Sequence, residues 1–385
     1  MSAAPGTMGT GTGGAPAVAP GPVTVLDPER GHAATGRLTT GPDSALHLSG
    51  VAAADGGQTG SLYLTPGWVD LHAHVYDGVT EISVHPDRVG LDHGVHLLAD
   101  AGSAGQATVR GLTDYVMPRA DTAIRVWLNI GSHGLVHLRE VADPTFIDVD
   151  ATLAAITAHR DVVCGVKVRS SGLIVGAMGL QPVQLARLVA REAGLPLMVH
   201  IGEPPPLIAD VLDLLDSGDV VTHCFHGKTG HPWNPDGSPT PALRRALERG
   251  VLLDVGHGAA SFDVDVARAA LARGHRPHSI STDIHVRNIR GPVFDLATVM
   301  TKMLDCGLPL FDVVAAVTAN PRRVLRSDEP WLHGDGRIRH ATLFRLTERA
   351  PSGRAYLDAG GKTLEPRRHI VPLATIRDGV ARPTP

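Results

Sequence analysis

The most chemically suggestive pair in the sequence is His72 and His74, which stand two positions apart in the run WVDLHAHV at residues 68–75. Side chains two positions apart on a β-strand point to the same face, so we expect Asp70, His72 and His74 to share one face and the apolar residues between them to pack against helices. Two imidazoles on one face reach a single metal ion, and histidine is the commonest metal ligand. The pair therefore predicts a metal site, although the same spacing also occurs without one.

Further polar side chains stand at the ends of four later apolar runs, each between aliphatic neighbours. Period-two alternation places them on the same inner face as the histidine pair. They are Lys167 and Arg169 in VCGVKVR, His200 in LMVHI, His223 in VTHC, and Asp283 in ISTDI. Four histidines, one lysine and one carboxylate offer nitrogen and oxygen ligands without thiolate, which suits zinc, our first expectation, or manganese.

The inward lysine is the least expected member of this set, because a buried ammonium is costly unless it is paired or chemically changed. Carbamylation of Lys167 by carbon dioxide would convert the amine into an anionic bridge between two divalent ions. Two ions about 3.5–4 Å apart share a hydroxide and polarise a carbonyl oxygen. A lysine that reaches the rim or pairs with a carboxylate is the alternative.

Eight short apolar runs would position these residues, and most are separated by segments with helical periodicity. The pattern is typical of an α/β fold of the (β/α)8 TIM-barrel type, whose active sites lie at the C-terminal ends of the strands. A doubly wound open sheet would usually carry a glycine-rich phosphate turn after the first strand, and residues 67–78 contain none. We place the barrel at residues 67–325, with strands at 67–75, 94–100, 124–130, 162–169, 196–201, 219–225, 251–256 and 279–284.

The two ends of the chain have a different sequence pattern from the middle. Residues 23–66 and 326–385 contain short β-type runs separated by glycine and aspartate turn signals, so we expect them to pair into a small β-sandwich domain. Residues 1–22 are rich in glycine, alanine, proline and threonine. They lack the basic start and apolar run of a signal peptide, and we expect a disordered tail.

Composition excludes several classes of function. The net charge of −4 without a basic stripe argues against nucleic acid or an anionic membrane as partner. The three cysteines form no CxxC pair, which argues against disulfides or zinc–thiolate sites and fits a reducing cytoplasm. No apolar run approaches 18 residues, so no membrane span is expected. We expect a small-molecule substrate, and the sequence leaves a homo-oligomer open.

Residues 66–74, together with Lys167, His200, His223 and Asp283, resemble the amidohydrolase superfamily of metal-dependent hydrolases. The resemblance covers essentially residues 23–378. It is closest to the dihydroorotase-like amidohydrolase/deacetylase branch, to which five stretches are similar: DAGSAG at 100–105, GVKVR at 165–169, THCFHGK at 222–228, DVGHG at 254–258 and STDIH at 281–285.

The resemblance implies a hydrolase that cleaves an acyl ester or amide, such as an acetyl group, from a small carboxylate-bearing substrate. It implies that His72, His74 and Asp283 hold the more buried metal and that His200 and His223 hold the other. Carbamylated Lys167 would bridge the two ions. Asp283 would act as general base on the metal-bridged hydroxide and then as general acid toward the leaving group.

Two positions depart from the pattern of this branch. True dihydroorotases usually carry an arginine that grips the substrate carboxylate where this chain has Tyr76, which argues against dihydroorotase activity. A cyclic amidase of the dihydroorotase or hydantoinase type is therefore the alternative function and not the first. Asn320-Pro321-Arg322 replaces the usual Asn-Pro-Ala. A mononuclear deaminase shares the histidine pair, one later histidine and the late aspartate, but it does not need Lys167.

Candidate substrate contacts lie just beyond the ligand-bearing runs. Arg169 could hold a substrate carboxylate through two hydrogen bonds, or it could form a structural ion pair with a loop carboxylate. Asn129 could bind substrate or hold a loop. His257, Ser261 and His285 follow the last two strands, where a role in supporting the site is the alternative to direct contact.

Overall fold

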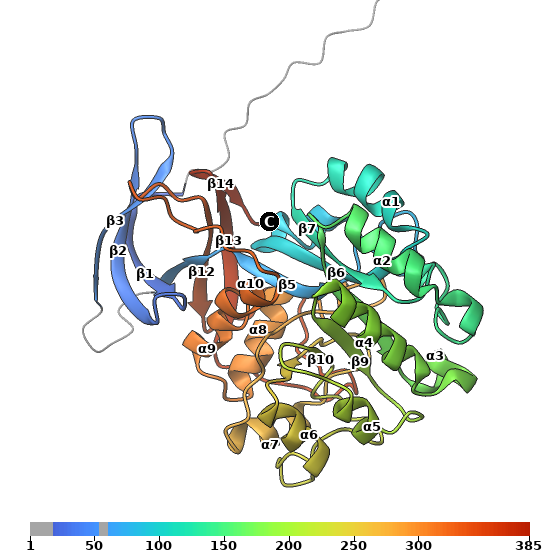
Figure 1. Cartoon of the computed structure of the whole chain (residues 1–385). Helices are drawn as coiled ribbons and strands as arrows, with labels where there is room; N and C mark the ends of the chain where they lie inside the picture. The colour runs from blue at the N-terminus through green and yellow to red at the C-terminus, as the bar shows by residue number, and fades with distance from the viewer. Residues whose placement is uncertain (1–17, 54–60) are drawn as a thin grey trace, which may run out of the picture.

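The computed structural model describes residues 18–53 and 61–385, so most of the predicted tail lies outside the described residues. A curled parallel sheet of seven strands occupies the middle of the chain, and its strands are neighbours in chain order. Figure 1 shows this sheet with helices around it. Its strands are β5 (Trp68–Ala73), β6 (Val95–Gly105), β7 (Ala123–Asn129), β8 (Val163–Ser170), β9 (Leu197–Ile201), β10 (Val220–Thr222) and β11 (Leu252–Asp254).

The predicted eighth strand at 279–284 is an irregular segment in the structure, yet it closes the sheet. Single bridges join Ser279 to Asp254 on one side and Ile284 to Ala73 on the other. The Asp283 N–H donates to the His72 carbonyl at 2.7 Å. Both open edges of the curled sheet are therefore hydrogen-bonded to the same segment, and the predicted barrel is confirmed.

Strand β5 does not alternate strictly. A register shift interrupts its pairing with β6 between Asp70 and Ala73. Val69 and Leu71, which strict alternation places against the helices, pack inside the barrel with residues of four other strands: Ala99, Trp127, Met198 and Val220. The carboxylate of Asp70 accepts hydrogen bonds from the Thr282 backbone and hydroxyl, at 3.0 and 2.5 Å. Asp70 thus ties the first strand to the eighth segment.

Ten α-helices lie around the sheet in the described part of the chain. Four begin with an aspartate or threonine side chain that accepts a backbone N–H, which satisfies donors left free at a helix start. They are α1 (Val109–Gly111), α2 (Val149–Ala158), α3 (Gly172–Val175), α4 (Gln181–Ala193), α5 (Ile208–Asp213), α6 (Pro241–Glu248), α7 (Val264–Ala272), α8 (Leu296–Asp305), α9 (Leu310–Ala315) and α10 (Ala319–Val324).

No single helix among the described residues is long and apolar enough to span a membrane. The segments Gly172–Met178 and Gln181–Ala193 meet the length and composition requirement only as a pair bent by 89°. Val183, Ala186 and Val189 of this pair pack in the core between the sheet and the helices, whereas Leu173 and Leu188 are exposed.

The two ends of the chain form one seven-stranded sheet beside the barrel, in the order β14-β13-β12-β4-β1-β2-β3 (Figure 1). The predicted joint β domain is present, and its strands form one continuous sheet. Its far edges meet where the Leu46 N–H donates to the Gly379 carbonyl at 2.7 Å. The strands are β1 (Gly21–Asp27), β2 (His32–Thr40), β3 (Leu46–Ala53), β4 (Leu62–Pro66), β12 (His340–Thr347), β13 (His369–Arg377) and β14 (Val380–Pro383).

Part of the C-terminal region packs on the barrel and not in the β domain. Tyr356 and Leu364 belong to the barrel core. The Ala359 N–H donates to the Phe262 carbonyl at 2.9 Å. The segment between β12 and β13 therefore supports the loop that follows β11.

Candidate active site

The polar residues at the strand ends converge on one cluster. His72 Nε2 and His74 Nε2 lie 3.3 and 3.0 Å from Asp283 Oδ1. The ring of His223 lies 5.2 Å from that of His72 and 4.4 Å from that of His200, between centroids. One ligand atom from each of His72, His223 and Asp283 lies within 4.8 Å of the others. The structure thus assembles five of the predicted ligands from segments more than 200 residues apart.

The distal nitrogens of the histidine pair are turned into this cluster because the proximal nitrogens are held from behind. His72 Nδ1 lies 2.9 Å from Thr222 Oγ1, and His74 Nδ1 lies 3.0 Å from Ser103 Oγ. The Thr222 hydroxyl in turn donates to Asp254 at 2.7 Å. Hydrogen bonds of this kind fix ring orientation in metal-binding histidines and raise ligand basicity.

His223 and Asp283 both adopt left-handed backbone, with φ of 69° and 49°. Residues other than glycine rarely adopt this conformation, and it costs on the order of 1–3 kcal/mol where it is imposed. The His223 Nδ1–H donates to the Gly256 carbonyl at 2.6 Å, so the second ring nitrogen, Nε2, is an acceptor. Nε2 is buried and has no hydrogen-bond partner among the described residues. A buried imidazole nitrogen with a free lone pair is a suitable ligand atom for a metal ion.

Lys167 completes the cluster from β8. Its Nζ lies 3.2 Å from His72 Nε2 and 3.4 Å from Met198 Sδ, and the residue is 1% exposed. Within the described part of the chain, no carboxylate lies within ion-pair distance of Nζ. Burial lowers the pKa of Lys167 to about 7, which leaves a substantial fraction of the amine neutral near neutral pH.

The protonation states of the cluster also fit a metal centre. Burial lowers the pKa of His72 and His200 well below the ordinary histidine value and that of His223 to about 4. Burial works against ionisation of Asp283, but His72 and His74 beside it hold the pKa of Asp283 well below its usual range. Neutral imidazoles and an ionised carboxylate are the forms that bind metals.

Arg169, predicted as a substrate contact, forms the structural ion pair that was the alternative. Its Nε and Nη2 donate to the two oxygens of Glu140 at 2.7 and 2.6 Å, and Nη2 also donates to the Leu138 carbonyl. The Glu140 side chain is fully buried. Two of the three guanidinium nitrogens are therefore engaged, and Nη1 alone is left for a ligand.

Asn129 and Tyr76 are also engaged within the protein. The Asn129 side chain is fully buried, donates to the Gly102 carbonyl at 2.9 Å and accepts from the Gly131 N–H at 2.8 Å. It holds two strand-end loops, which was the alternative to substrate binding. The Tyr76 hydroxyl donates to the Thr108 carbonyl at 2.6 Å, so it offers no grip for a substrate carboxylate.

His257, predicted as a substrate contact, is engaged within the protein, which was the alternative. The residue is fully buried, its Nδ1 lies 2.8 Å from the Gly258 carbonyl and its Nε2 lies 2.8 Å from Lys302 Nζ. Lys302, also fully buried, donates further to the Pro292 and Leu357 carbonyls. His257 therefore supports the loop beside Asp283. Lys302 was not predicted from the sequence, because a lysine in an apolar helix carries no signal of its partner.

Ser261 and His285 remain near the cluster. Ser261 is buried in the loop after β11. The half-buried ring of His285 lies 6.3 Å from that of His74, and its Nδ1 accepts the Arg287 N–H at 3.2 Å. His285 is thus placed at the edge of the cluster with Nε2 available, and its role as a substrate contact stays a prediction.

Asp254 is the main supporting residue that was not singled out from the sequence. Its carboxylate is fully buried and accepts from the hydroxyls of Thr222, Ser279 and Ser281. It therefore links β10, β11 and the closing segment directly behind His72. The signal was present in the DVGHG stretch, but without a contact map no role could be attached to it.

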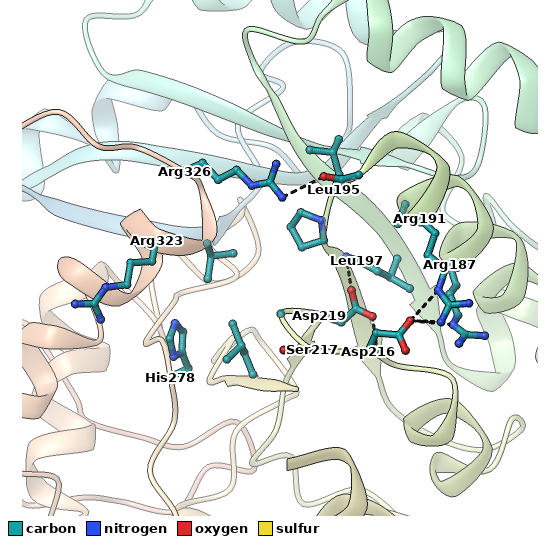
Figure 2. A pocket seen from close by; sticks show the side chains of 16 residues that line it. Arg187, Arg191, Leu195, Leu197, Asp216, Ser217, Asp219, His278, Arg323 and Arg326 are labelled. Atoms are coloured by element: carbon teal, nitrogen blue, oxygen red, sulfur yellow. Dashed lines mark hydrogen bonds and ion pairs between the residues drawn. The ribbon is translucent and has the colours of Figure 1, made fainter. Parts of the chain in front are cut away.

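A separate cavity of about 380 Å³ lies at the opposite end of the barrel, where β9, β10 and β11 begin. Figure 2 shows Arg187 and Arg191 turned toward Asp216, with His278 across the cavity. None of the six ligand residues lines it. The candidate active-site cluster and this cavity are therefore different places in the molecule.

Comparison with known proteins places the chain in a family. No family model matches it. A deacetylase from Agrobacterium fabrum is 45% identical over 289 residues, 74% of this chain and 71% of that protein. A crystal structure of a dihydroorotase superposes with a TM-score of 0.82 at 36% identity, covering 94% of this chain and 98% of the other. The chain belongs to the amidohydrolase superfamily. It is a hydrolase of the metal-dependent kind.

Two further proteins are similar to this chain. A deacetylase from Enterococcus faecalis is 33% identical over 323 residues, 82% of this chain and 86% of that protein. A crystal structure of an adenine deaminase superposes with a TM-score of 0.80 at 30% identity, covering 90% of this chain and 95% of the other. The resemblance read from the sequence motifs is confirmed at the level of the superfamily.

Proposed function

We propose that this amidohydrolase is a deacetylase, which cleaves an acyl amide or ester of a small carboxylate-bearing molecule. The observation that carries the proposal is the complete cluster of His72, His74, His200, His223, Asp283 and Lys167 in a chain whose curated relatives are named deacetylases. We propose a small molecule as its substrate, because the cluster is buried at the strand ends. The three buried free cysteines fit a reducing compartment, and we place the enzyme in the cytoplasm.

The unpartnered Nε2 of His223 and the neutral imidazoles fit a metal centre. His72, His74 and Asp283 would hold one divalent ion, and His200 and His223 would hold the other; zinc is the first choice and manganese the second. When bound, such ions polarise the scissile carbonyl and lower the pKa of water. The rest of the chemistry belongs to the side chains.

Asp283 is placed to move the proton. Its Oδ1 faces His72 and His74, and 14% of its side chain is exposed. An ionised carboxylate there accepts a proton from the attacking water and then donates it to the leaving nitrogen or oxygen. The left-handed backbone of Asp283 and its N–H donation to the His72 carbonyl fix the carboxylate for both steps.

Lys167 would contribute as a carbamate. The neutral Nζ attacks the carbon of carbon dioxide, an N–C bond forms, and the nitrogen loses one proton to solvent. The product is an anion in place of a buried amine that has no carboxylate partner in the described residues. This change would supply the negative charge that a pair of divalent ions needs.

A cyclic amidase is the second candidate, favoured by the dihydroorotase similarity. Tyr76 argues against it, because dihydroorotases usually carry an arginine at this position. The Tyr76 hydroxyl donates a hydrogen bond to the Thr108 carbonyl. The adenine deaminase similarity favours ammonia release from a heterocycle in the same way. A deaminase that binds one metal ion leaves Lys167 without a role.

One screen separates these activities. Purified protein loaded with zinc or manganese is assayed with N-acetyl amino acids, acetylated hydroxy acids, dihydroorotate, hydantoins and adenine. The proposal predicts acetate release from at least one acetylated acid, at a rate at least 100-fold above any ring opening or ammonia release. Turnover confined to cyclic amides or adenine contradicts it.

A further inference from the structure

Arg322 is a buried cation that the proposed chemistry does not use. It lies in α10, is 5% exposed, and makes one side-chain hydrogen bond, from Nη1 to the Glu329 carbonyl at 3.1 Å. Its Nε is buried and has no partner among the described residues. Among the described residues, Glu29 and Glu329 are the carboxylates that act electrostatically on Arg322, and both lie beyond ion-pair distance. A buried guanidinium without a paired anion is energetically unfavourable.

The guanidinium borders a cavity of about 220 Å³ between the barrel and the β domain, which we call the seam cavity. This volume is several times the roughly 30 Å³ that one water molecule occupies. The polar residues around it are Arg322, Arg377, His96, His340, Ser327 and Glu329.

The charges around the seam cavity are unbalanced toward positive. Arg322 and Arg377 border it, and the one acidic residue there, Glu329, already lies 3.4 Å from both His340 Nε2 and Arg339 Nη1. Glu329 is also 65% exposed, which places its charge largely in water. Glu329 is thus already paired with two other side chains, one of them at the cavity wall, while the Nε donor of Arg322 stays unfilled among the described residues.

The seam cavity is distinct from the catalytic cluster. His96 and Ala123 stand at the N-terminal ends of β6 and β7, whereas the ligands follow the C-terminal ends of the strands. His96 is fixed there, because its Nε2 donates to the Ala341 carbonyl of the β domain at 2.9 Å. A ligand in this cavity would contact both domains at once.

We propose that the seam cavity binds a small oxyanion, either a phosphate-type or a carboxylate ligand, through Arg322 and Arg377. The arginine fork matches the spacing of two oxygens in both classes of ligand. Occupancy would satisfy the open donors of Arg322 and would hold the barrel and the β domain together. The site is independent of the proposed deacetylase activity.

Titration calorimetry of the metal-loaded protein with inorganic phosphate, sulfate and malonate tests the proposal, with sodium chloride at matched ionic strength as blank. The variants are Arg322→Ala and Arg323→Ala; the second removes a neighbouring arginine of α10 that does not border the seam cavity. We expect one saturable site per chain for at least one oxyanion, unchanged in Arg323→Ala and at least 10-fold weaker in Arg322→Ala. The same anion should raise the melting temperature of the wild type but not of Arg322→Ala.

Two further variants keep the test decisive. His223→Ala removes a catalytic ligand, so binding that persists there shows that the anion is not on the metal centre. Arg377→Ala, a change at an exposed arginine, should weaken binding at least threefold even if Arg322→Ala fails to fold. Failure of all three anions to bind below about 10 mM, binding unchanged in Arg322→Ala or Arg377→Ala, or binding lost in His223→Ala overturns the proposal.

Discussion

At the scale of single residues, the candidate active site depends on groups that hold the ligands from behind. Thr222 is the clearest case, because its one hydroxyl contacts both His72 Nδ1 and the buried carboxylate of Asp254. The hydroxyl fixes the direction in which His72 presents Nε2. Loss of such a contact typically weakens metal binding 10- to 100-fold in proteins of known metal content.

Thr222→Val should therefore lower metal affinity about 10-fold to 100-fold while keeping the side-chain volume. Competition with a chelator, read by metal analysis after desalting, measures the change. Thr157→Val on the exposed face of α2 is the control and should bind metal like the wild type. An unchanged affinity in Thr222→Val would show that the hydroxyl does not orient the ligand.

The ion pair between Arg169 and Glu140 makes a second prediction at this scale. Glu140→Gln leaves a largely buried guanidinium without its anion, so the free energy of unfolding should fall by about 3–5 kcal/mol. Urea denaturation measures the loss. The exposed pair of Arg191 with Asp216 is the matched control, and Asp216→Asn should cost at most about 1 kcal/mol. Equal losses in the two variants would contradict a structural role for the buried pair.

At the scale of elements, the loop after β11 shapes the surroundings of Asp283. Gly258 has a φ of +58°, and a Cβ added there would lie 2.5 Å from Asp283 Oδ2. The loop is in turn supported by His257, whose ring contacts Lys302. Lys302 also donates to the Leu357 carbonyl in the segment between β12 and β13. The position of the carboxylate thus depends on backbone that can pass close to it only without a side chain.

Gly258→Ala should reduce kcat at least 10-fold, because the new methyl group displaces the proton-transfer carboxylate. Gly274→Ala is the control: its φ is +84°, but no atom lies within 4 Å of the added Cβ. Both variants should lose about 1 kcal/mol of stability from the left-handed backbone, and only Gly258→Ala should lose activity. Equal activity in the two variants would mean that Asp283 tolerates displacement.

Helix α8 gives a stability prediction with a defined pH dependence. Asp295 accepts the Thr298 N–H at its N-terminus and pairs with Arg354 at 2.5 Å. Burial works to raise its pKa, but His93 and Arg354 hold the pKa of Asp295 well below the ordinary value of 3.8. A lowered folded-state pKa contributes stability that is present above the unfolded value and lost as pH falls through the folded value.

Asp295→Ala should therefore lower the free energy of unfolding by about 2–4 kcal/mol at pH 7, from the lost cap and the unpaired Arg354. The difference from wild type should shrink as pH falls below about 4, because the Asp295 carboxylate of the unfolded chain takes up a proton there while that of the folded chain stays ionised. Urea denaturation between pH 7 and pH 3 measures both. A difference that stays constant or grows on acidification would contradict the assigned charge state.

The pairing of each strand decides which of its side chains could be predicted to point into the barrel. Alternation correctly placed Lys167 and His200 inside the barrel, because β8 and β9 are regular there. It failed for Val69 and Leu71, because a register shift in β5 is a property of its pairing with β6. Asp283 was correctly placed beside the histidine pair although its segment is not a strand. The partner of Arg169 could not be predicted, because no pattern in the sequence indicates that residue 140 lies beside residue 169.

At the scale of the whole molecule, the chain crosses between its two domains several times. The β domain takes strands from both ends, and the C-terminal segment returns to the barrel through Leu357 and Ala359. The sequence predicted that the ends would pair, from their shared β-type runs. It did not predict the return, because the segment contains no periodic pattern that indicates a partner.

The central claim is that six side chains form one metal centre in which Lys167 is a member. Metal analysis of the purified wild-type protein, Lys167→Ala and Lys362→Ala tests it, with hydrolysis of acetylated acids measured on the same samples. Lys362 is a surface lysine, 48% exposed in its side chain, and serves as control. We predict about two divalent ions per chain in wild type and control, and loss of most metal and activity in Lys167→Ala. A Lys167→Ala protein with full metal content and full activity would contradict the claim.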